Sequence, residues 1–231
     1  MAMMGESVAV VIGASGGIGA ALLSALRADG SYGTVMAFSR SGTPRLDITD
    51  EGSVRDVAAS LAPDVPTLVI DATGFLHDAA HRPEKSWREL DPAQMARAFA
   101  LNAIGPALLM KHFLPLLPAQ GRSIFATISA KVGSIGDNRL GGWYSYRASK
   151  AALNQLMHTA AIELARSRPQ AICVALHPGT VATALSAPFA KAGLKVRDAN
   201  TAAQELLAVL AGLTPADSGG FFDHQGQALP W

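Results

Sequence analysis

The residues whose types and spacing best suit proton transfer are a tyrosine and a lysine four positions apart. Tyr146 and Lys150 lie in the run Tyr-Arg-Ala-Ser-Lys, and residues at i and i+4 share one face of a helix. An unperturbed phenol titrates near pH ~10, and a cation beside it favours the phenolate form. The pair therefore predicts a proton donor or acceptor that works near neutral pH. On its own, the spacing is also typical of a solvated helix face.

A glycine-rich turn lies about 130 residues before this pair. The apolar run at 8–12 is followed by Gly-Ala-Ser-Gly-Gly-Ile-Gly at 13–19 and then by a segment with helical apolar periodicity. A strand, a tight turn and a helix in this order bring backbone amides close to a pyrophosphate and aim the helix N-terminus at its charge. The segment therefore predicts dinucleotide binding, although a glycine cluster alone is often only a loop.

The residues after the second expected strand bear on the choice of coenzyme. This strand, at 34–39, ends at Ser39 and is followed by Arg40. NAD-selective folds place a carboxylate here, whereas an arginine can accommodate a 2′-phosphate. NADPH is therefore expected in preference to NADH, the alternative being that Arg40 is a solvated loop cation.

With both motifs present, the chain resembles the short-chain dehydrogenase/reductase family in its compact one-domain subclass. Gly13, Gly17 and Gly19 match the family's Gly-x-x-x-Gly-x-Gly pattern, and the resemblance runs from residue 8 to about residue 183. The stretch at 136–145 and the ending at 229–231 are similar to the carbonyl-reductase and cell-contact-signalling branch. The resemblance implies an NADP(H)-dependent oxidoreductase that moves a hydride between nicotinamide and a carbonyl or alcohol substrate, as an aldehyde or ketone reductase does.

The resemblance also implies a catalytic set of Asn102, Ser129, Tyr146 and Lys150. Lys150 would lower the pKa of Tyr146, Ser129 would donate to the substrate oxygen, and Asn102 would hold a water that relays protons. Ser129 ends the fifth expected strand but lies seventeen positions before the tyrosine, where many relatives have thirteen. A four-residue insertion at 136–145 accounts for the difference, and Ser134 is the competing candidate. Asn102 could instead only satisfy backbone groups.

The coenzyme contacts that the resemblance implies are spread along the chain. Pro178 and Gly179 would shape the nicotinamide site, and Asp47 would bind the adenine amine. The complete set is Gly13, Ser15, Gly16, Gly17, Ile18, Gly19, Ser39, Arg40, Asp47, Ile48, Ala72, Gly74, Tyr146, Lys150, Pro178, Gly179, Val181 and Thr183. One departure is at 71–74, where the family's Asn-Asn-Ala-Gly is replaced by Asp-Ala-Thr-Gly. The polar side chain lost at Ala72 normally ties neighbouring strands, which puts local rigidity in doubt.

Composition limits the possible classes of protein. The 231 residues suffice for one well-buried domain over 1–231, and 49% hydrophobic residues suit a sheet covered on both faces. A net charge of +1 without a basic cluster argues against nucleic acid as a partner. Lys111, His112 and two prolines interrupt the apolar stretch at 108–118, so no membrane span is expected. The N-terminus lacks a basic start, and a cytoplasmic location follows.

Alternating strand and helix patterns predict an α/β fold of the Rossmann type, with a seven-stranded, mostly parallel sheet and helices on both faces. The expected strands are at 8–12, 34–39, 44–47, 66–72, 122–129, 171–177 and 219–222. The expected helices are at 17–29, 51–61, 91–116, 144–167 and 199–212. Residues 184–197 could form a short substrate lid or an ordinary surface segment. Residues 78–88 are expected to be a surface loop without a metal, despite His77 and His81.

Three other functions remain open. The first is a dinucleotide-binding signalling protein or redox sensor with little turnover. The second is a sugar-nucleotide epimerase, which shares the Tyr-x-x-x-Lys pair but needs a larger C-terminal domain than the roughly fifty residues after Pro178 can build. The third is a purely structural module, which would leave the tyrosine and lysine unexplained. A homodimer or homotetramer formed through the helices at 91–116 and 144–167 is expected from the resemblance.

Overall fold

Six parallel strands form the central sheet of the computed structural model, which describes residues 7–62, 64–189 and 196–231. The strand order is β2-β1-β3-β4-β5-β6. The strands are β1 Val8–Ile12, β2 Thr34–Phe38, β3 Pro66–Asp71, β4 Ser123–Ile128, β5 Ala171–His177 and β6 Phe221–Asp223. Because all named strands run parallel, their carboxyl ends meet at one edge of the sheet. The order reverses between β1 and β3, which is where ligands bind in open α/β sheets.

The prediction of a seventh strand at 44–47 is wrong, although the fold class is confirmed. Only an isolated bridge joins Ser39 to Arg45. The Asp47 carboxylate accepts hydrogen bonds from the backbone N–H (3.1 Å) and the hydroxyl (2.7 Å) of Thr49. This local turn directs the chain into α2 rather than along β2. The last strand also begins at Phe221, since Gly219 and Gly220 still belong to the preceding turn.

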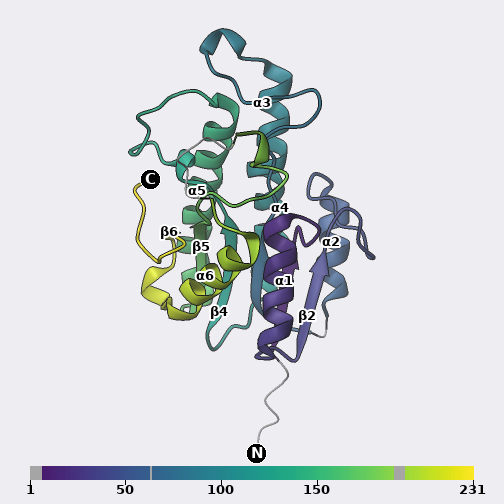
Figure 1. Cartoon of the computed structure of the whole chain (residues 1–231). Coiled ribbons are helices and arrows are strands. Elements are labelled where there is room, and N and C mark those ends of the chain that lie inside the picture. The colour runs from purple at the N-terminus through teal and green to yellow at the C-terminus, as the bar shows by residue number, and fades with distance from the viewer. Residues whose placement is uncertain (1–6, 63, 190–195) are drawn as a thin grey trace, which may run out of the picture.

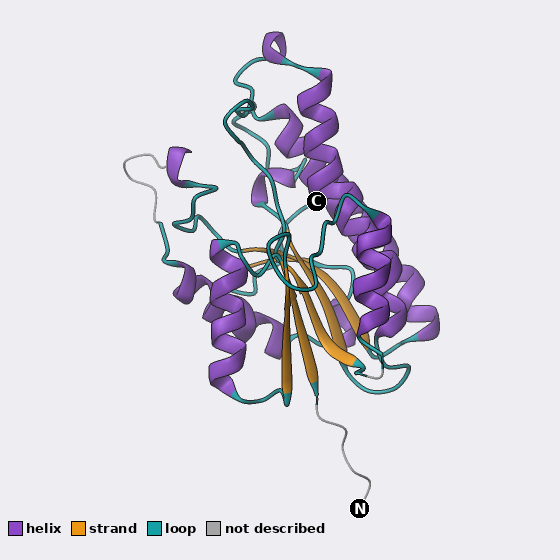
Figure 2. Cartoon of the chain, turned by 90° about the vertical axis from the view of Figure 1, so that its right-hand side faces the viewer, coloured by secondary structure: helices purple, strands orange, loops and turns teal. Residues whose placement is uncertain are grey.

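Helices cover both faces of the sheet, as Figures 1 and 2 show. They are α1 Gly17–Asp29, α2 Glu51–Ser60, α3 Pro92–Phe99, α4 Gly105–Phe113, α5 Tyr144–Ser167 and α6 Ala199–Gly212. Alternation along β1 separates two cores: Val10 packs in the cluster that contains Leu109 and Leu153, while Val11 packs in the cluster that contains Leu22. The α2, α4 and α5 layer therefore covers one face, and the α1 and α6 layer covers the other.

The expected helix at 91–116 is confirmed, but it changes pitch in the middle. A π-helical turn, Ala100–Ile104, joins α3 to α4, and the short 3₁₀ helix Leu114–Leu116 ends the rod. Pro106 cannot donate to the carbonyl four residues earlier, that of Asn102, and its ring crowds that carbonyl. A wider turn relieves the conflict, and such turns occur often at functional sites.

The same rod, Pro92–Leu116, is long and apolar enough to cross a membrane by length and composition alone, against the expectation from sequence. Its best window has a mean hydropathy of 1.2, and 44% of that window is buried inside the fold. Core helices pass the same test, and Leu109 and Phe113 here are fully buried against the sheet. The rod is part of the packed core.

Candidate active site and coenzyme site

The glycine turn after β1 leaves no room for a side chain at two of its positions. Gly13 has φ +81°, and a Cβ there would lie 2.9 Å from the carbonyl group of Ala72. A Cβ on Gly19 would lie 2.2 Å from the Gly13 oxygen. Gly16 caps α1 without any side-chain hydrogen bond, and no acidic residue lies in its first turn. The open N–H groups and the positive end of α1 therefore fit a pyrophosphate group.

Ser15 and Ile18 complete this turn, and a distant segment closes over it. Ser15 is exposed, and Ile18 packs against the α1 and α6 core. The Thr183 methyl lies 2.7 Å from where a Cβ of Gly17 would be. Thr183 also lines a pocket of about 440 Å³ with Thr180, Ala182, Ala184, Ser186, Ala187 and Val196. The resemblance implies that Thr183 contacts either the nicotinamide carboxamide or the phosphates of the coenzyme, and its position against the glycine turn leaves such a contact sterically possible.

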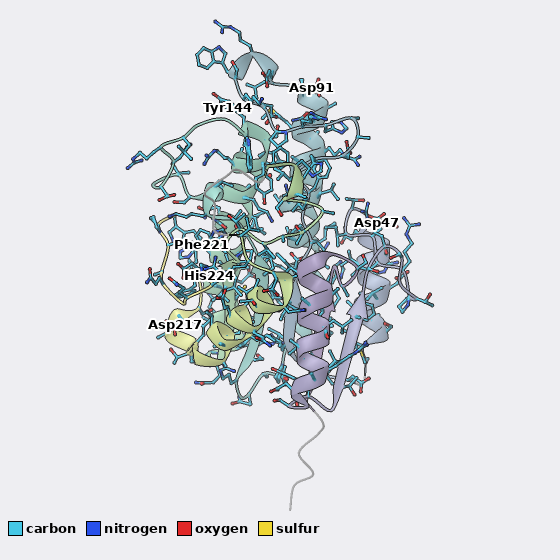
Figure 3. The ribbon with its side chains drawn as sticks, in the orientation of Figure 1. Asp47, Asp91, Tyr144, Asp217, Phe221 and His224 are labelled. Atoms are coloured by element: carbon cyan, nitrogen blue, oxygen red, sulfur yellow. The ribbon has the colours of Figure 1, made fainter. Side chains whose placement is uncertain are left out.

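The end of β2 presents an arginine without a competing carboxylate. Ser39 is half-buried, Arg40 is exposed, and Arg40 forms no ion pair within the described residues. Asp47, near α2, is already bonded to Thr49 and pairs with Arg45 at 3.1 Å. The hydrogen bond from Thr49 is the main reason that the pKa of Asp47 is lowered. Figure 3 shows that Asp47 lies well away from Tyr144, the first residue of α5.

Ile48 differs from the other expected contacts, because its side chain is used in packing. It is 6% exposed, and its Cδ1 would lie 2.7 Å from a Cβ of Gly105. Only the backbone of Ile48 could face a coenzyme. Val181 is likewise buried, and its backbone is bridged to Arg197.

The departure at 71–74 is compensated by the aspartate. Asp71 is fully buried, and its carboxylate accepts hydrogen bonds from Thr73 and from the Thr127 hydroxyl on β4 at 2.9 Å. The tie between strands that Ala72 cannot make is therefore made by Asp71 and Thr127. Burial raises the pKa of Asp71, while the hydrogen bonds from Thr73 and Thr127 oppose the shift. The sequence alone did not single out Thr127.

Gly74 and Asn102 lie near Lys150. A Cβ on Gly74 would lie 3.8 Å from Lys150 Nζ and 3.9 Å from Asn102 Oδ1. The fully buried Asn102 amide accepts from the Phe75 N–H at 2.7 Å and donates to the Phe75 carbonyl at 2.8 Å and to Ser149 Oγ at 3.0 Å. Its amide is thus occupied in joining the π turn to the loop after β3 and to α5. The open alternative, that Asn102 satisfies backbone groups, describes what this side chain does here.

Tyr146 and Lys150 lie on α5, as predicted, but the expected acidification of the phenol is absent from this structure. Burial raises the pKa of Tyr146 to about 12. Burial also lowers the pKa of Lys150 to about 8, against the opposing charge of Asp71. The ammonium donates to the Ile128 carbonyl at 2.8 Å. Desolvation therefore outweighs the charge effect expected from the i, i+4 spacing, and the phenol stays protonated at neutral pH.

The two candidate serines differ in their surroundings. Ser129 directly follows β4, next to the carbonyl that Lys150 holds, and its hydroxyl donates to Asn154 Oδ1 at 2.6 Å. Ser134 lies beyond a 3₁₀ turn, and its Oγ accepts the Asp137 N–H at 3.1 Å. Ser134 thus stabilises the following loop, and Ser129 has the position at the strand end that the prediction required.

A buried glutamate that the sequence did not single out fixes the start of α5. Glu84 is 2% exposed, and its carboxylate accepts from the Ser145 N–H at 3.1 Å and from the Ser145 hydroxyl. Its carbonyl accepts the Trp143 N–H at 2.5 Å. The negative charge lies at the positive end of α5. Glu84 therefore holds the helix that presents Tyr146.

A cluster of aromatic rings packs against the Tyr146 ring through Trp143. The Trp143 ring packs edge-to-face with Tyr146 at 6.2 Å and with Phe189 at 5.2 Å. Phe189 also packs on His77 at 5.3 Å, and His77 Nε2 donates to the Leu185 carbonyl at 3.1 Å. Trp143 has φ +53°, a strained conformation for a non-glycine residue that the Glu84 contact holds. The part of the expected lid at 190–195 lies outside the described residues.

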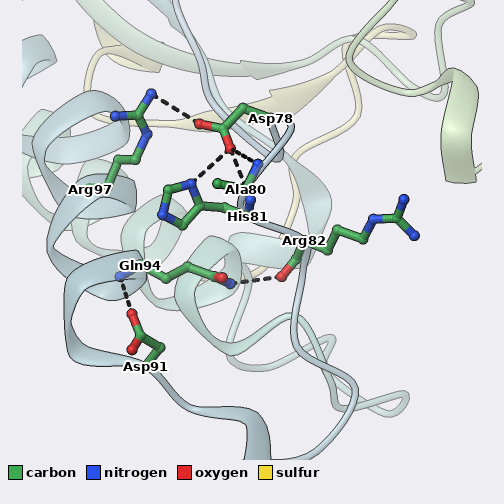
Figure 4. A network of polar contacts seen from close by, with 7 residues as sticks. All are labelled: Asp78, Ala80, His81, Arg82, Asp91, Gln94 and Arg97. Atoms are coloured by element: carbon green, nitrogen blue, oxygen red, sulfur yellow. Dashed lines mark hydrogen bonds and ion pairs between the residues drawn. The ribbon is translucent and has the colours of Figure 1, made fainter.

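The loop at 78–88 is tied to α3 by a polar network (Figure 4). Asp78 pairs with Arg97 at 3.0 Å and with His81 at 2.8 Å, and Gln94 donates to the Arg82 carbonyl at 2.8 Å. The His81 hydrogen bond is the main reason that the pKa of Asp78 falls to about 2. His81 thus serves as a hydrogen-bond partner of Asp78, and no group of three or more potential metal ligands occurs within residues 7–62, 64–189 and 196–231.

The Pro-Gly segment after β5 has the turn that the resemblance implies. Gly179 has φ +74°, and a Cβ there would lie 2.8 Å from the Arg197 guanidinium. His177, just before Pro178, is packed beside His224, and burial lowers the pKa of His177 to about 4. The chain after this segment forms α6 and β6, which complete the sheet, so the described part contains no second domain of the kind an epimerase needs.

Comparisons with known proteins show the family to which the chain belongs. Residues 13–211 match the family model described as enoyl-(acyl carrier protein) reductase, one of the short-chain dehydrogenase models. The C-signal of Myxococcus xanthus is 38% identical over 62% of this chain and 82% of its own length. The 1-hydroxy-2-glutathionyl-2-methyl-3-butene dehydrogenase of Rhodococcus sp. (strain AD45) is 32% identical over 81% of this chain and 79% of its own length.

A similar solved structure is the NADPH-bound carbonyl reductase from chicken fatty liver. Its TM-score is 0.82 at 28% identity, with 98% of this chain and 99% of that chain covered. The family match, the glycine turn and the Tyr146–Lys150 pair all point the same way. The chain belongs to the short-chain dehydrogenase/reductase family of NAD(P)-dependent oxidoreductases.

Proposed function

We propose that the protein is an NADPH-dependent carbonyl reductase acting on apolar aldehydes or ketones. The observation that carries the proposal is the Tyr146–Lys150 pair, whose residues lie one helical turn apart on α5, with Lys150 bonded to the end of β4. Because the pKa of Tyr146 lies above neutral pH, its phenol is protonated there and has a proton to give to a substrate oxygen. The apolar ring cluster of Trp143 and Phe189 beside it suits an apolar or aromatic substrate.

The residues would divide the work as follows. A bound reduced nicotinamide would supply the hydride. Tyr146 would protonate the substrate oxygen, and Ser129 would donate a hydrogen bond to the same oxygen, where negative charge develops. Lys150 would stabilise the phenolate left after transfer, and the Ile128 carbonyl, which accepts from the ammonium at 2.8 Å, would keep it in place.

Support for NADPH comes from both the chain and a relative. Arg40 is exposed after β2, with no carboxylate beside it at the end of the strand. The chicken reductase carries NADPH, as its description states. A charge-assisted bond is worth about 1.5–3 kcal/mol, so Arg40→Ala should raise the NADPH Kd about tenfold or more and leave the NADH Kd nearly unchanged. Arg55→Ala, which removes an exposed arginine on α2, is the control, and equal losses for both coenzymes would contradict the assignment.

The direct test of the function is NADPH oxidation with a panel of aldehydes and ketones, aromatic and aliphatic. Steady turnover with an apolar carbonyl compound is expected. Tight NADPH binding without turnover on any compound would instead favour a second candidate, a dinucleotide-binding signalling protein. The 38% identity to the C-signal is the observation that supports this candidate.

We also propose a homodimer or homotetramer built through α4 and α5. The outer faces of this region expose large apolar side chains, namely Ile104 at 54%, Leu156 at 38% and Ile162 at 53%. A partner copy would remove them from water. Light scattering of the purified protein should give at least twice the monomer mass, and a monomer at micromolar concentration would contradict this.

A further inference from the structure

Behind the proposed catalytic serine lies a buried amide that the mechanism above does not use. Asn154 follows Lys150 by one helical turn on α5 and is 3% exposed. Its Oδ1 accepts the Ser129 hydroxyl at 2.6 Å, and Ser129 itself is 2% exposed. Asn154 is thus the polar side chain that directly contacts Ser129 Oγ.

The observed hydrogen bond uses the proton that the mechanism needs. A serine hydroxyl has one proton, and here that proton points at Asn154. The Ser129 N–H is also engaged, by the Leu176 carbonyl at 2.8 Å. In this arrangement Ser129 cannot donate to a substrate oxygen.

The nitrogen end of the same amide allows a second arrangement that frees the serine proton. Asn154 Nδ2 is buried and has no hydrogen-bond partner in the described part of the chain. The two ends of an asparagine amide have nearly the same shape, so a half-turn of the group exchanges them at little steric cost. After this turn, Nδ2 would donate to Ser129 Oγ, and the hydroxyl proton would be free to point toward the substrate.

We propose that Asn154 is a positioning residue for the reduction proposed above, and that the orientation of its amide decides whether Ser129 can donate to the substrate oxygen. The proposal depends on that function. No bond between heavy atoms is made or broken in this step, and no proton is transferred from one residue to another. The amide turns and the serine proton reorients. The serine hydroxyl then donates a hydrogen bond to the substrate oxygen, where negative charge develops.

The test is a double-mutant cycle between Asn154→Asp and Ser129→Ala. A carboxylate can only accept, so it would retain the serine proton, and kcat should fall by about 10² or more, the loss typical of one missing oxyanion donor. KM for the carbonyl compound and the NADPH Kd should stay near the wild-type values. In the Ser129→Ala background, Asn154→Asp should cost nothing further, because there is no serine proton left to direct.

Matched variants separate this role from a structural one. Gln155→Glu makes the same chemical change one residue away on the exposed face of α5, and it should leave kcat unchanged. Asn154→Leu removes the amide but leaves the serine free to turn, so its loss should be smaller than that of Asn154→Asp. If Asn154→Asp does not fold, the same cycle run with Asn154→Leu decides the question, since its loss should also vanish without the serine.

The outcomes distinguish the two proposals. Wild-type turnover followed by an Asn154→Asp loss that vanishes in the Ser129→Ala background supports the inference. Wild-type turnover with a loss that persists undiminished in that background, or with no loss at all, overturns the inference and leaves the reductase function standing. A wild-type protein that binds NADPH but reduces no carbonyl compound overturns the function and the inference together.

Discussion

Two helices begin at the edges of the proposed site, and their N-termini are satisfied in opposite ways. The N-terminus of α1 follows Gly16, which offers no side-chain cap, and its first turn has no acidic residue. The N-terminus of α5 is filled by the buried carboxylate of Glu84. Both ends carry the same partial positive charge. One is left open for the phosphates of a coenzyme, whereas the other is neutralised by the protein so that Tyr146 and Lys150 keep their places.

The difference teaches that electrostatic preference alone does not mark a ligand site. A helix start binds a ligand only where the chain leaves its N–H groups unpaired and gives the ligand room. At α1 the room comes from Gly13 and Gly19, where no Cβ fits. At α5 the room is taken by protein, and the helix serves as a rigid support.

Of the changes at the two helix starts, the one at the open start should have the larger effect. Gly19→Ala would place a Cβ 2.2 Å from the Gly13 oxygen, so the turn must open. Overpacking costs about 1–3 kcal/mol, so we expect the NADPH Kd to rise up to ~100-fold, measured by fluorescence titration.

The control for this change is at the other end of the same helix. Gly30 also has positive φ, +70°, but a Cβ there would meet no atom within 4 Å. Gly30→Ala should cost about 1–2 kcal/mol of stability and leave coenzyme binding intact. Equal coenzyme affinity for Gly19→Ala and the wild type would break the comparison.

The second expected effect is at the filled helix start. Glu84→Gln weakens the acceptor for Ser145 and removes the charge at the helix end. We expect the free energy of unfolding to fall by about 1–3 kcal/mol and turnover to fall about tenfold, since a small displacement of a catalytic group is costly. NADPH affinity should change little.

A matched change in the same loop isolates the effect. Glu89 is exposed, and its carboxylate accepts the Lys85 N–H at 2.8 Å. Glu89→Gln should be close to wild type in urea unfolding and in turnover. The comparison would lose its basis if both glutamates behaved alike.

The open helix start could be predicted from sequence, and the filled one could not. The turn at 13–19 is recognised from a pattern of glycines within seven residues, although Gly13 also needs room beside Ala72. Glu84 meets Ser145 across 61 positions, and Asp71 meets Thr127 across 56. Such pairs depend on tertiary packing, which has no local pattern. The same reasoning explains the missing acidification of Tyr146, because its burial is a property of the folded site rather than of its spacing from Lys150.

The strand at 44–47 was overpredicted for a related reason. The apolar residue at position 46 and its neighbours suited a strand. The Asp47 carboxylate instead accepts local hydrogen bonds from Thr49 and starts a turn. Pro106 accounts for the π turn at Asn102 and is visible in the sequence. The sequence does not show how the helix packs, however, and the change of pitch depended on that packing. Tyr146 and Lys150 lie on α5 as predicted, and Ser129 directly follows β4, one residue after its last residue Ile128.

The smallest expected effect is a pH dependence of turnover and stability that arises from Lys150 on α5. Because the pKa of Lys150 is lowered to about 8, its ammonium is present below that pH and lost above it. Turnover should be level below about pH 8 and decline above. Stability should move the other way: the unfolded lysine titrates near ~10.5, so the unfolded chain binds more protons between the two values, and the free energy of unfolding rises with pH there.

Lys150→Arg separates this group from all others that titrate. A guanidinium keeps its charge throughout the range, so a slower but level pH–rate profile is expected above pH 8. A decline at the same pH in both proteins would assign the titration to another group.

The central claim is tested most directly by removing one oxygen atom. Tyr146→Phe should bind NADPH with the wild-type Kd, because α5 and the glycine turn are unchanged, and should lose about 10²–10⁴-fold in turnover on the best carbonyl substrate. Tyr32→Phe, far along the chain in the loop before β2, should match the wild type in both measurements. Reduction by Tyr146→Phe at the wild-type rate would contradict the assignment of the phenol as the proton donor.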